Sequence, residues 1–564
     1  MIVLGINHSN DAAAAIVRDG VVIAASREER FSRVKHDSSF PHRAIDFCLK
    51  AGDVALEDLD GVAFFWNPGI HATTPNSRMS GSFRHHLEFL HTVPNNLLPR
   101  IPGVDVGHVE QIFHLTSGKQ LRVHYVTHHL CHAASVLFRS PFEDSALLTV
   151  DGYGERASTH VAQGAGLDIE TLHTVEFPHS LGSVYAAFTQ YLGFRANNGE
   201  GKVMGLASYG GTVFDEVIGE MIRPTETGFT VDLDFFGYQS PHGPRYSQRL
   251  VELLGPPRLP DSPVEQHHMD IAHGLQKATE ETLLHLARLT REKTGSPRLG
   301  MAGGVVLNCV ANGRIAREAG FEECFFQPAA DDAGTSMGAA LWVSHCLNRA
   351  PRAKEVTATD YLGPAYGETT IEEALQRAGV AYERCEDAPA EAARMLADGH
   401  IIGWFQGAAE FGPRALGNRS ILANPALEAV KDTLNARVKF REPFRPFAPS
   451  CLEESCGELF DSDVPSPYML RVYNTLEARS ADLEGVTHVD GGARVQTVNK
   501  TQNPRYHALI EAFNDLTGIP CVLNTSFNIR GEPIVHTVAD ALKCTLTTGM
   551  DAVFIGDFKV VKGE

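Results

Sequence analysis

The hydrophobic pattern at the start of the chain predicts a strand followed by a hairpin. Residues 2–6 form a continuous apolar run, which indicates a buried strand, and the polar loop of residues 7–11 follows it. Two further apolar runs flank Asp19-Gly20, a dipeptide typical of a two-residue hairpin turn. The pattern therefore predicts a strand, a polar loop that contains an aspartate, and a hairpin, in that order.

A similar succession returns in the middle of the chain. Apolar residues 146–150 precede the loop Asp151-Gly152-Tyr153-Gly154, and strands are expected near residues 158–162 and 169–175, with a glycine-containing turn between them. The repetition is consistent with a duplicated lobe, and two unrelated hairpins explain the pattern equally well.

The pattern changes after residue 350. Beyond it the chain predicts a helix around residues 370–378, a strand in HIIGWFQ and a late buried strand in CVLNTS. A chain of 564 residues is too long for one core. We therefore expect a boundary between Ala350 and Ala365, with domains at residues 1–352 and 360–564.

Composition narrows the class of protein. The chain is 43% apolar and 21% charged, as in a soluble globular enzyme, and its formal charge of −20 argues against a nucleic-acid or anionic-membrane partner. The N-terminus carries no signal-peptide pattern, and no apolar run is long enough to span a bilayer. The ten cysteines lack CxxC spacing, which is typical of reduced thiols, so a cytoplasmic location is expected.

The sharpest local signal is Thr127-His128-His129-Leu130-Cys131-His132. Thr127 is a plausible N-cap, and His128 and His132 are then four apart on one helical face. Such pairs are often surface decoration, but carboxylate loops at Asp151 and at Asp331-Asp332 offer further ligands. A mixed histidine and carboxylate set suits iron(II), manganese or zinc.

Two glycine motifs are weaker signals. Gly303-Gly304 leads into an apolar segment that ends at Asn308, which suits close approach of a nucleotide but also a plain tight turn. Residues 334–338 match the GxSxG nucleophile elbow around Ser336, but no strand runs directly into the serine. We interpret this segment as a helix start.

Cations gather in the C-terminal part, interleaved with glycine, proline and aromatic residues. In an acidic protein this clustering favours a phosphate pocket, although for any one residue a surface ion pair is the more common role. The polar residues of this constellation are Arg414, Arg419, Lys439, Arg441, Arg445, Arg494, Asn524, Ser526, Asn528 and Arg530.

The combination of motifs resembles the NodU/CmcH family of carbamoyltransferases over nearly the whole length. The matching segments are EERFSRVKH, HHLCHAAS, VDGYGE, GKVMGLASYG, AGGVVLN, FGPRALGNRSIL, RVKFREPFRPFAPS, QNPRYH and LNTSFNIRGEPIV. The resemblance implies an α/β fold: a duplicated actin-like (ASKHA or RNase H-like) N-terminal domain and a YrdC-like α/β C-terminal domain.

The resemblance also implies a two-step reaction. The YrdC-like domain would condense carbamoyl phosphate with ATP, which brings Mg²⁺, to carbamoyl adenylate and release pyrophosphate. The N-terminal domain would then transfer the carbamoyl group to a hydroxyl of a small-molecule acceptor, such as an antibiotic or another secondary metabolite. Splitting one hard transfer into two activated steps is the general logic of such intermediates.

Roles for individual residues follow from the matching motifs. The family's iron(II) ligands would be His128, His132, Asp151 and Asp332. Gly152, Gly303, Gly304 and Asn308 would line the N-terminal nucleotide site. The carbamoyl phosphate and ATP pocket would comprise Arg414, Lys439, Arg445, Arg494, Thr497, Asn524, Ser526 and Asn528. Lys439, Arg494 and Ser526 would act on the reacting groups, and Lys35 would contact the acceptor.

One position departs from the family pattern. The first loop carries Asn10 where the family usually has a histidine that is suited to handling the acceptor proton. Asparagine cannot act as a general base, so we hypothesise that His8 or Asp11 takes this role.

Three other interpretations compete with this one. The nearest is a tRNA threonylcarbamoylation-type enzyme, which the net negative charge disfavours. A metal-dependent hydrolase built on His128 and His132, or a serine hydrolase built on Ser336, is more distant. A non-catalytic nucleotide-binding module would leave the C-terminal cations without a purpose.

Overall fold

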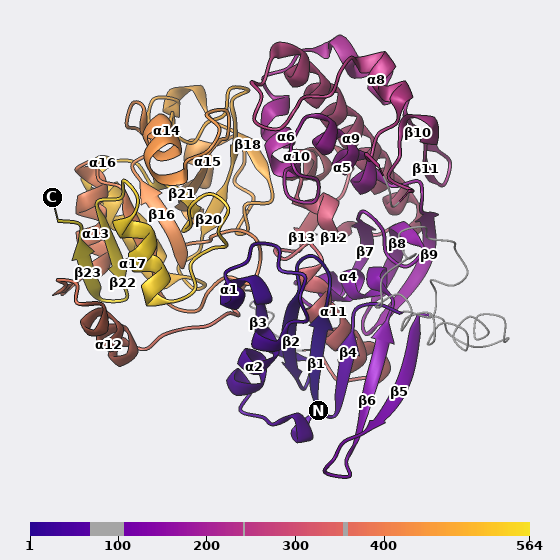
Figure 1. The fold of residues 1–564 in the computed structure, drawn as a ribbon, viewed down its shortest axis with the longest axis horizontal. Helices are drawn as coiled ribbons and strands as arrows, with labels where there is room; N and C mark the ends of the chain where they lie inside the picture. Colours follow the sequence, from indigo (N-terminus) through magenta and orange to yellow (C-terminus); the bar gives the residue numbers. More distant parts are fainter. Residues whose placement is uncertain (68–106, 241–242, 353–358, 564) are drawn as a thin grey trace. The chain divides into compact units, whose positions relative to one another are not determined.

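The structure is a computed structural model that describes residues 1–67, 107–240, 243–352 and 359–563. The chain folds into two compact units (Figure 1). The first unit comprises residues 1–25 and 38–358, and the second comprises residues 26–37 and 359–564. A short N-terminal segment therefore belongs to the C-terminal unit.

The first sheet of the first unit has the strand order β3-β2-β1-β4-β6-β5. β1 is antiparallel to β2 and parallel to β4, and β4 is parallel to β6. Asp19 and Gly20 join β2 to β3 with φ of 50° and 80°, the positive values that the tight hairpin turn requires. The strands are β1 (Ile2–Asn7), β2 (Ala13–Arg18), β3 (Val21–Arg27), β4 (Gly61–Phe64), β5 (His108–His114) and β6 (Gln120–Val126).

The second sheet repeats this arrangement. Its order is β13-β12-β7-β8-β9, in which β7 is antiparallel to β8 and parallel to β12, and β12 is parallel to β13. The strands are β7 (Asp144–Val150), β8 (Ala157–Ala165), β9 (Asp168–Glu176), β12 (Arg298–Ala302) and β13 (Glu323–Phe326). Read from the other edge, β9-β8-β7-β12-β13 matches β3-β2-β1-β4-β6 strand for strand, so the duplicated lobe is confirmed.

Two helices join the sheets. α4 (His128–Leu137) packs on β7 and β12, α11 (Ala333–Trp342) packs on β1 and β2, and the two helices pack on each other. They approach so closely that a Cβ at Gly338 would lie 1.8 Å from the carbonyl oxygen of Cys131. Ser336 is buried within α11 and its hydroxyl donates to the carbonyl of Ala333 at 2.7 Å, so GxSxG is a helix segment and not a nucleophile elbow.

The other regular elements of the first unit complete its two lobes. The long helix α9 packs against α6, α7 and α10. These elements are α2 (His42–Ala51), α5 (Leu181–Tyr191), α6 (Glu200–Ala207), α7 (Asp215–Gly219), β10 (Ile222–Thr225), β11 (Gly228–Val231), α8 (Gln248–Leu254), α9 (Gln266–Thr294) and α10 (Cys309–Glu318).

The second unit is built on a mixed eight-stranded sheet. In spatial order its strands are β14 (Glu383–Arg384), β23 (Phe558–Val561), β22 (Ala552–Ile555), β15 (Ile402–Phe405), β16 (Arg419–Ala423), β21 (Cys521–Ser526), β17 (Ala448–Leu452) and β20 (Gln496–Val498). A separate pair is formed by β18 (Val472–Asn474) and β19 (Gly492–Arg494). The expected strands in HIIGWFQ and CVLNTS are β15 and β21.

Helices cover this sheet and close one hydrophobic core with it. α13 packs on α16, α16 packs on β17 and β21, and α17 packs on β15 and β22. The helices of the second unit are α1 (Glu28–Ser32), α12 (Glu368–Ala378), α13 (Ala388–Ala397), α14 (Val430–Thr433), α15 (Cys456–Leu459), α16 (Pro504–Thr517) and α17 (Val538–Leu546). The expected mixed α/β class is confirmed in both units. Within the described ranges, no helix has the length and apolar character needed to cross a membrane.

Candidate metal centre and candidate anion site

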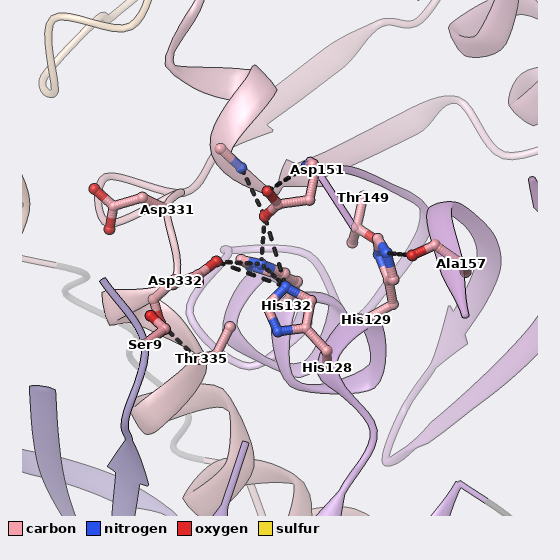
Figure 2. A network of polar contacts seen from close by, with 12 residues as sticks. Ser9, His128, His129, His132, Thr149, Asp151, Ala157, Asp331, Asp332 and Thr335 are labelled. Atoms are coloured by element: carbon pink, nitrogen blue, oxygen red, sulfur yellow. Dashed lines mark hydrogen bonds and ion pairs between the residues drawn. The ribbon is translucent and has the colours of Figure 1, made fainter. Parts of the chain in front are cut away.

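Four side chains from separate parts of the first unit converge on one point. His128 and His132 lie on α4, Asp151 directly follows β7, and Asp332 directly precedes α11. One ligand atom from each lies within 4.8 Å of all the others. Figure 2 shows the four pointing toward one another, whereas Asp331 points away.

The distances suit a shared cation. The Nε2 atoms of His128 and His132 are 3.1 Å apart, and the latter lies 3.0 Å from Oδ2 of Asp151. Oδ1 of Asp332 is 3.6 Å from Nε2 of His128 and 3.9 Å from Nε2 of His132. Both imidazoles are buried. Two nitrogens and two carboxylates are a donor set that suits a divalent transition metal.

The four side chains of this cluster shift one another's pKa values in opposite directions. Burial would raise the pKa of Asp151, but hydrogen bonds from His128 and His132 lower it well below its usual value. Burial and the charge of Asp151 raise the pKa of Asp332 to about 7. Burial disfavours a charge on His128, but its bond to Asp151 and the charge of Asp332 raise its pKa to about 9, whereas burial and the charge of His128 lower the pKa of His132 to about 4. The cluster therefore retains a proton that a divalent cation would displace.

The middle histidine of the motif has a different role. Nδ1 of His129 is 2.6 Å from the Thr149 hydroxyl, and its Nε2 is 3.0 Å from the carbonyl oxygen of Ala157. The ring thus ties α4 to β7 and β8 and does not enter the cluster (Figure 2).

Sequence reasoning missed Glu155, which holds the start of α4. Its two carboxylate oxygens each accept from the backbone N–H of His128 at 3.1 Å, and one also accepts from the N–H of Asn67 at 2.7 Å. Thr127 occupies the expected N-cap position, but its side chain makes no capping bond. The buried carboxylate of Glu155 caps the helix instead. A negative charge is stabilised here because the N-terminus of a helix carries a partial positive charge.

The first loop borders the metal cluster. Nδ2 of Asn7 donates to the carbonyls of Asp332 at 2.7 Å and Asp11 at 3.0 Å. The charge of Asp11 contributes to the raised pKa of Asp332, so the two carboxylates lie near each other. The His8 ring packs edge-on against Phe40, with 5.5 Å between centroids. Whether His8 or Asp11 handles the acceptor proton stays a prediction.

The glycine motif also adjoins Asp151. The N–H of Gly304 donates to Oδ2 of Asp151 at 3.0 Å, and Gly303 has φ of 100° with its Cα so near β7 that a Cβ would lie 2.2 Å from the carbonyl oxygen of Val150. A Cβ on Gly152 would meet open space.

Asn308 has an internal role in this structure. Its Oδ1 accepts from the N–H of Ala311 at 3.1 Å, which caps α10, and its amide exchanges bonds with the Gln276 amide at 2.9 and 3.0 Å. The predicted nucleotide contacts of Gly152, Gly303, Gly304 and Asn308 stay predictions.

In the second unit, a buried lysine joins two predicted site residues. Nζ of Lys439 donates to the carbonyls of Ser526 at 2.7 Å and Asn528 at 2.8 Å, and to Oδ1 of Asn528 at 2.9 Å. The Ser526 hydroxyl donates to the same Oδ1 at 2.6 Å. Lys439 ends a π-helical turn, Leu434–Lys439, and Phe440 follows with φ of 46°, a strained value typical of functional sites.

Arginines gather near this lysine, and after burial the charges of two of them, Arg441 and Arg445, lower its pKa. Burial, then repulsion by Arg445 and Arg494, lowers the pKa of Arg441 to about 8. Burial also lowers the pKa of Arg445, and the charges of Arg494 and Arg530 contribute. Glu442 approaches two of these arginines, Arg445 at 3.8 Å and Arg530 at 4.0 Å. A group of arginines whose charges repel one another is suited to binding an anion.

The remaining predicted residues of the second unit differ in how they are held. The Thr497 hydroxyl accepts from the N–H of Ser466 at 2.9 Å. Nδ2 of Asn524 donates to Ser450 and Gln496, while its buried Oδ1 has no partner among the described residues. Arg414 is half-buried on the loop between β15 and β16.

Arg419 does not belong to the proposed phosphate pocket. Its buried guanidinium donates to the carbonyls of Gln406, Asn418, Pro364 and Gly407. It also lies 3.7 Å from the centroid of the Phe405 ring. Its donors hold the chain around β16 together, which corrects the interpretation of this arginine as a phosphate ligand.

Comparison with known proteins covers both units. Residues 2–341 match the family model described as carbamoyltransferase N-terminus, and residues 393–562 match carbamoyltransferase C-terminus. An uncharacterized Synechocystis protein is 39% identical over 99% of this chain and 96% of its own length. The nodulation protein NolNO of Sinorhizobium fredii is 41% identical over 98% of this chain and 79% of its own. The 3'-hydroxymethylcephem-O-carbamoyltransferase of Amycolatopsis lactamdurans is 28% identical over 99% and 98%.

Solved structures are more distant. The Acidaminococcus fermentans (R)-2-hydroxyglutaryl-CoA dehydratase component A is 14% identical over 62% of this chain and 99% of its own, with a TM-score of 0.32. Full-length HypF in its phosphate- and nucleotide-bound form is 13% identical over 61% of this chain and 55% of its own, also with a TM-score of 0.32. Scores this low carry no argument about function.

Proposed function

Because the chain belongs to the carbamoyltransferase family, we propose that it is an ATP-dependent O-carbamoyltransferase whose two units each perform one step. The expectation of a carbamoyltransferase of the NodU/CmcH type is confirmed by the family models and by the nodulation and cephem relatives. The donor chemistry, the metal, the acceptor and the cytoplasmic location are proposals.

The cation cluster of the second unit is the observation that carries the donor step. Carbamoyl phosphate and ATP, the latter with Mg²⁺, carry negative charge that would offset the mutual repulsion of Arg441, Arg445, Arg494 and Arg530. In the proposed reaction water hydrolyses carbamoyl phosphate to carbamate and inorganic phosphate, a carbamate oxygen then bonds to the α-phosphorus of ATP, and the bond from that phosphorus to pyrophosphate breaks. Lys439 fixes the Ser526–Asn528 turn, and its charge and those of the arginines offset the charge that develops at phosphorus.

The first unit is proposed to perform the transfer step. His128, His132, Asp151 and Asp332 would hold a divalent metal, with iron(II) as the family's metal. When bound, such a metal supplies Lewis-acid polarisation of an oxygen ligand. Glu155 keeps α4 in place, and His8 or Asp11 would accept the proton of the acceptor hydroxyl as its oxygen bonds to the carbamoyl carbon and AMP leaves.

A hydroxyl on a small molecule is the proposed acceptor. The cephem relatives are named for O-carbamoylation of a hydroxymethyl group, and an antibiotic or another secondary metabolite would fit the same chemistry here. The rival tRNA threonylcarbamoylation-type function is disfavoured by the formal charge of −20.

Release of pyrophosphate tests the donor step without knowledge of the acceptor. Purified protein with ATP, Mg²⁺ and carbamoyl phosphate should release pyrophosphate only when both substrates are present. Radiolabelled carbamoyl phosphate with a panel of polyhydroxylated metabolites should then identify the acceptor. Absence of carbamoyl phosphate-dependent pyrophosphate release, with the protein folded and metal-loaded, would contradict the proposal.

A further inference from the structure

An N-terminal segment is built into the second unit. Residues 26–37 contain α1 and three arginines, Arg27, Arg30 and Arg33, spaced three apart. All three donate to backbone carbonyls of residues that lie several hundred positions later in the sequence. The side chains of Arg27 and Arg30 are buried.

The arginines hold two loops. Nε of Arg27 donates to the carbonyl of Phe411 at 3.2 Å, and Nη2 of Arg30 donates to that of Gly412 at 3.1 Å. Both carbonyls belong to residues 406–418, hereafter the Arg414 loop. On the other side, Arg33 donates to the carbonyls of Ile534 at 2.7 Å and Pro533 at 3.0 Å. These belong to residues 527–537, hereafter the Asn528 loop.

Further contacts secure the second of these attachments. Nε of Arg33 lies 3.4 Å from Oδ1 of Asp540 on α17, and the rings of Phe31 and His536 meet edge-on at 4.6 Å. The segment thus binds the Asn528 loop through a forked guanidinium, an ion pair and a ring contact.

Both loops carry predicted anion-site residues, and each has a second anchor within the unit. In the Arg414 loop, the N–H of Gly412 donates to Oδ2 of Asp360 at 2.8 Å. In the Asn528 loop, Lys439 binds the carbonyl of Asn528. The bases of the two loops are already joined, because β16 pairs with β21 and the N–H of Phe527 donates to the carbonyl of Arg419 at 2.9 Å. The segment adds a second connection farther along both loops.

The same segment brings another cation toward the site. Lys35 follows Arg33 by two residues, and its positive charge contributes to lowering the pKa of Lys439, after burial and the charge of Arg441. This electrostatic effect indicates that the end of the segment lies on the side of the unit where Lys439 binds Ser526 and Asn528.

We infer that residues 26–37 act as a strap that sets the separation of the Arg414 and Asn528 loops and thereby the affinity of the anion site for phosphorylated substrates. Binding groups must be held within a fraction of an ångström to act together, and a guanidinium fork fixes carbonyls more tightly than a single bond does. Arg33 is a positioning residue in this scheme, since it contacts loop backbone and acts on substrate through the loop. The inference rests on the proposed function only for the identity of the substrates.

The decisive variant is Arg33→Met, which keeps the length of the side chain and removes its donors. We expect KM for ATP and carbamoyl phosphate in pyrophosphate release to rise about tenfold while kcat changes less than about threefold, because ground-state binding is lost. Arg33→Lys, which retains the charge and one donor direction, should lie between the variant and the wild type. It also keeps the test usable if Arg33→Met does not fold.

Calorimetric titration with inorganic triphosphate measures the site without the reaction. The part of the heat that is absent in the Lys439→Met variant is assigned to binding at the anion site. The affinity of this site for triphosphate should fall about tenfold in Arg33→Met, as KM rises by the same factor. Arg349→Met is the matched control, because Arg349 pairs with Asp168 on the exposed surface of the first unit. That variant should bind triphosphate as the wild type does.

Two results are informative in different ways. Triphosphate affinity and KM within twofold of wild type in a folded Arg33→Met protein would overturn the strap. Weaker triphosphate binding by Arg33→Met, together with no pyrophosphate release by the wild type, would support the strap and contradict the proposed function.

Discussion

The two polar clusters of this protein are opposites in charge and in construction. The first unit gathers two carboxylates and two imidazoles, and the second gathers a lysine and four arginines with one nearby glutamate. The first cluster offers a donor set that suits a cation, and the positive charge of the second suits an anion. In the proposed function, one chain would therefore separate cation chemistry from anion chemistry in two units.

Their supports differ as well. The ligands of the metal cluster sit on one helix, at the end of one strand and at the start of another helix, which fixes a small ion closely. The predicted anion-site residues come partly from strand ends, such as Arg494 on β19 and Ser526 on β21, and partly from the Arg414 and Asn528 loops, which Lys439 and the strap hold. Loops suit a larger ligand, but their geometry depends on distant contacts.

The largest effect is expected from removal of the buried lysine, which should impair the anion site and leave the metal cluster intact. Lys439→Met should lower carbamoyl phosphate-dependent pyrophosphate release about 100-fold or more, because a preorganised positive charge and the anchor of the Ser526–Asn528 turn are both lost. Metal content, measured by elemental analysis, should be that of the wild type. A parallel loss of metal would show that the two clusters are not independent.

Conversely, a variant that removes a ligand of the metal cluster should leave the anion site intact. His132→Ala removes one of the four ligands, and bound metal should fall from about one equivalent to a small fraction, with acceptor carbamoylation lost. Pyrophosphate release should stay within about threefold of wild type. Retained metal at full stoichiometry would contradict the assignment of the cluster.

A smaller effect is expected at the residue that holds α4. Glu155→Gln replaces one acceptor oxygen by an N–H₂ group beside the His128 amide, and metal affinity should fall about 10- to 100-fold. Competition with a chromophoric chelator measures this affinity directly. Glu176→Gln is the control, because Glu176 is exposed and pairs with Arg156. Equal affinity in both variants would limit Glu155 to a structural role.

The effect that bears least on the two clusters is a pH dependence of the stability of the first unit. Burial lowers the pKa of His160 to about 4, against about 6.5 in an unfolded chain. Its contribution to stability is therefore complete above pH 6.5 and is lost as the pH falls toward 4. In His160→Asn the fall in melting temperature between these pH values should be smaller, by an amount equivalent to about 3 kcal/mol. An unchanged pH profile would refute this assignment.

Local sequence determined much of the framework. The apolar run before residue 7 and the Asp19-Gly20 turn predicted the first strand and hairpin, because strand and turn patterns are set over a few residues. The repetition near Asp151 left a duplicated lobe and two unrelated hairpins equally open, and the family resemblance implied the lobe. Spacing also put His128 and His132 on one helical face. The matching motifs named the carboxylates that the structure brings to the same point.

Tertiary structure alone decided how the sites are supported. Glu155 caps a helix that begins 27 residues earlier, and Arg33 binds Ile534 across 501 positions. Arg419 looked like a phosphate ligand in the sequence but is used by four carbonyls. Sequence periodicity records which face of an element is buried, whereas the partners of a buried donor depend on which distant backbone groups lack one, and that is fixed only when the chain has folded.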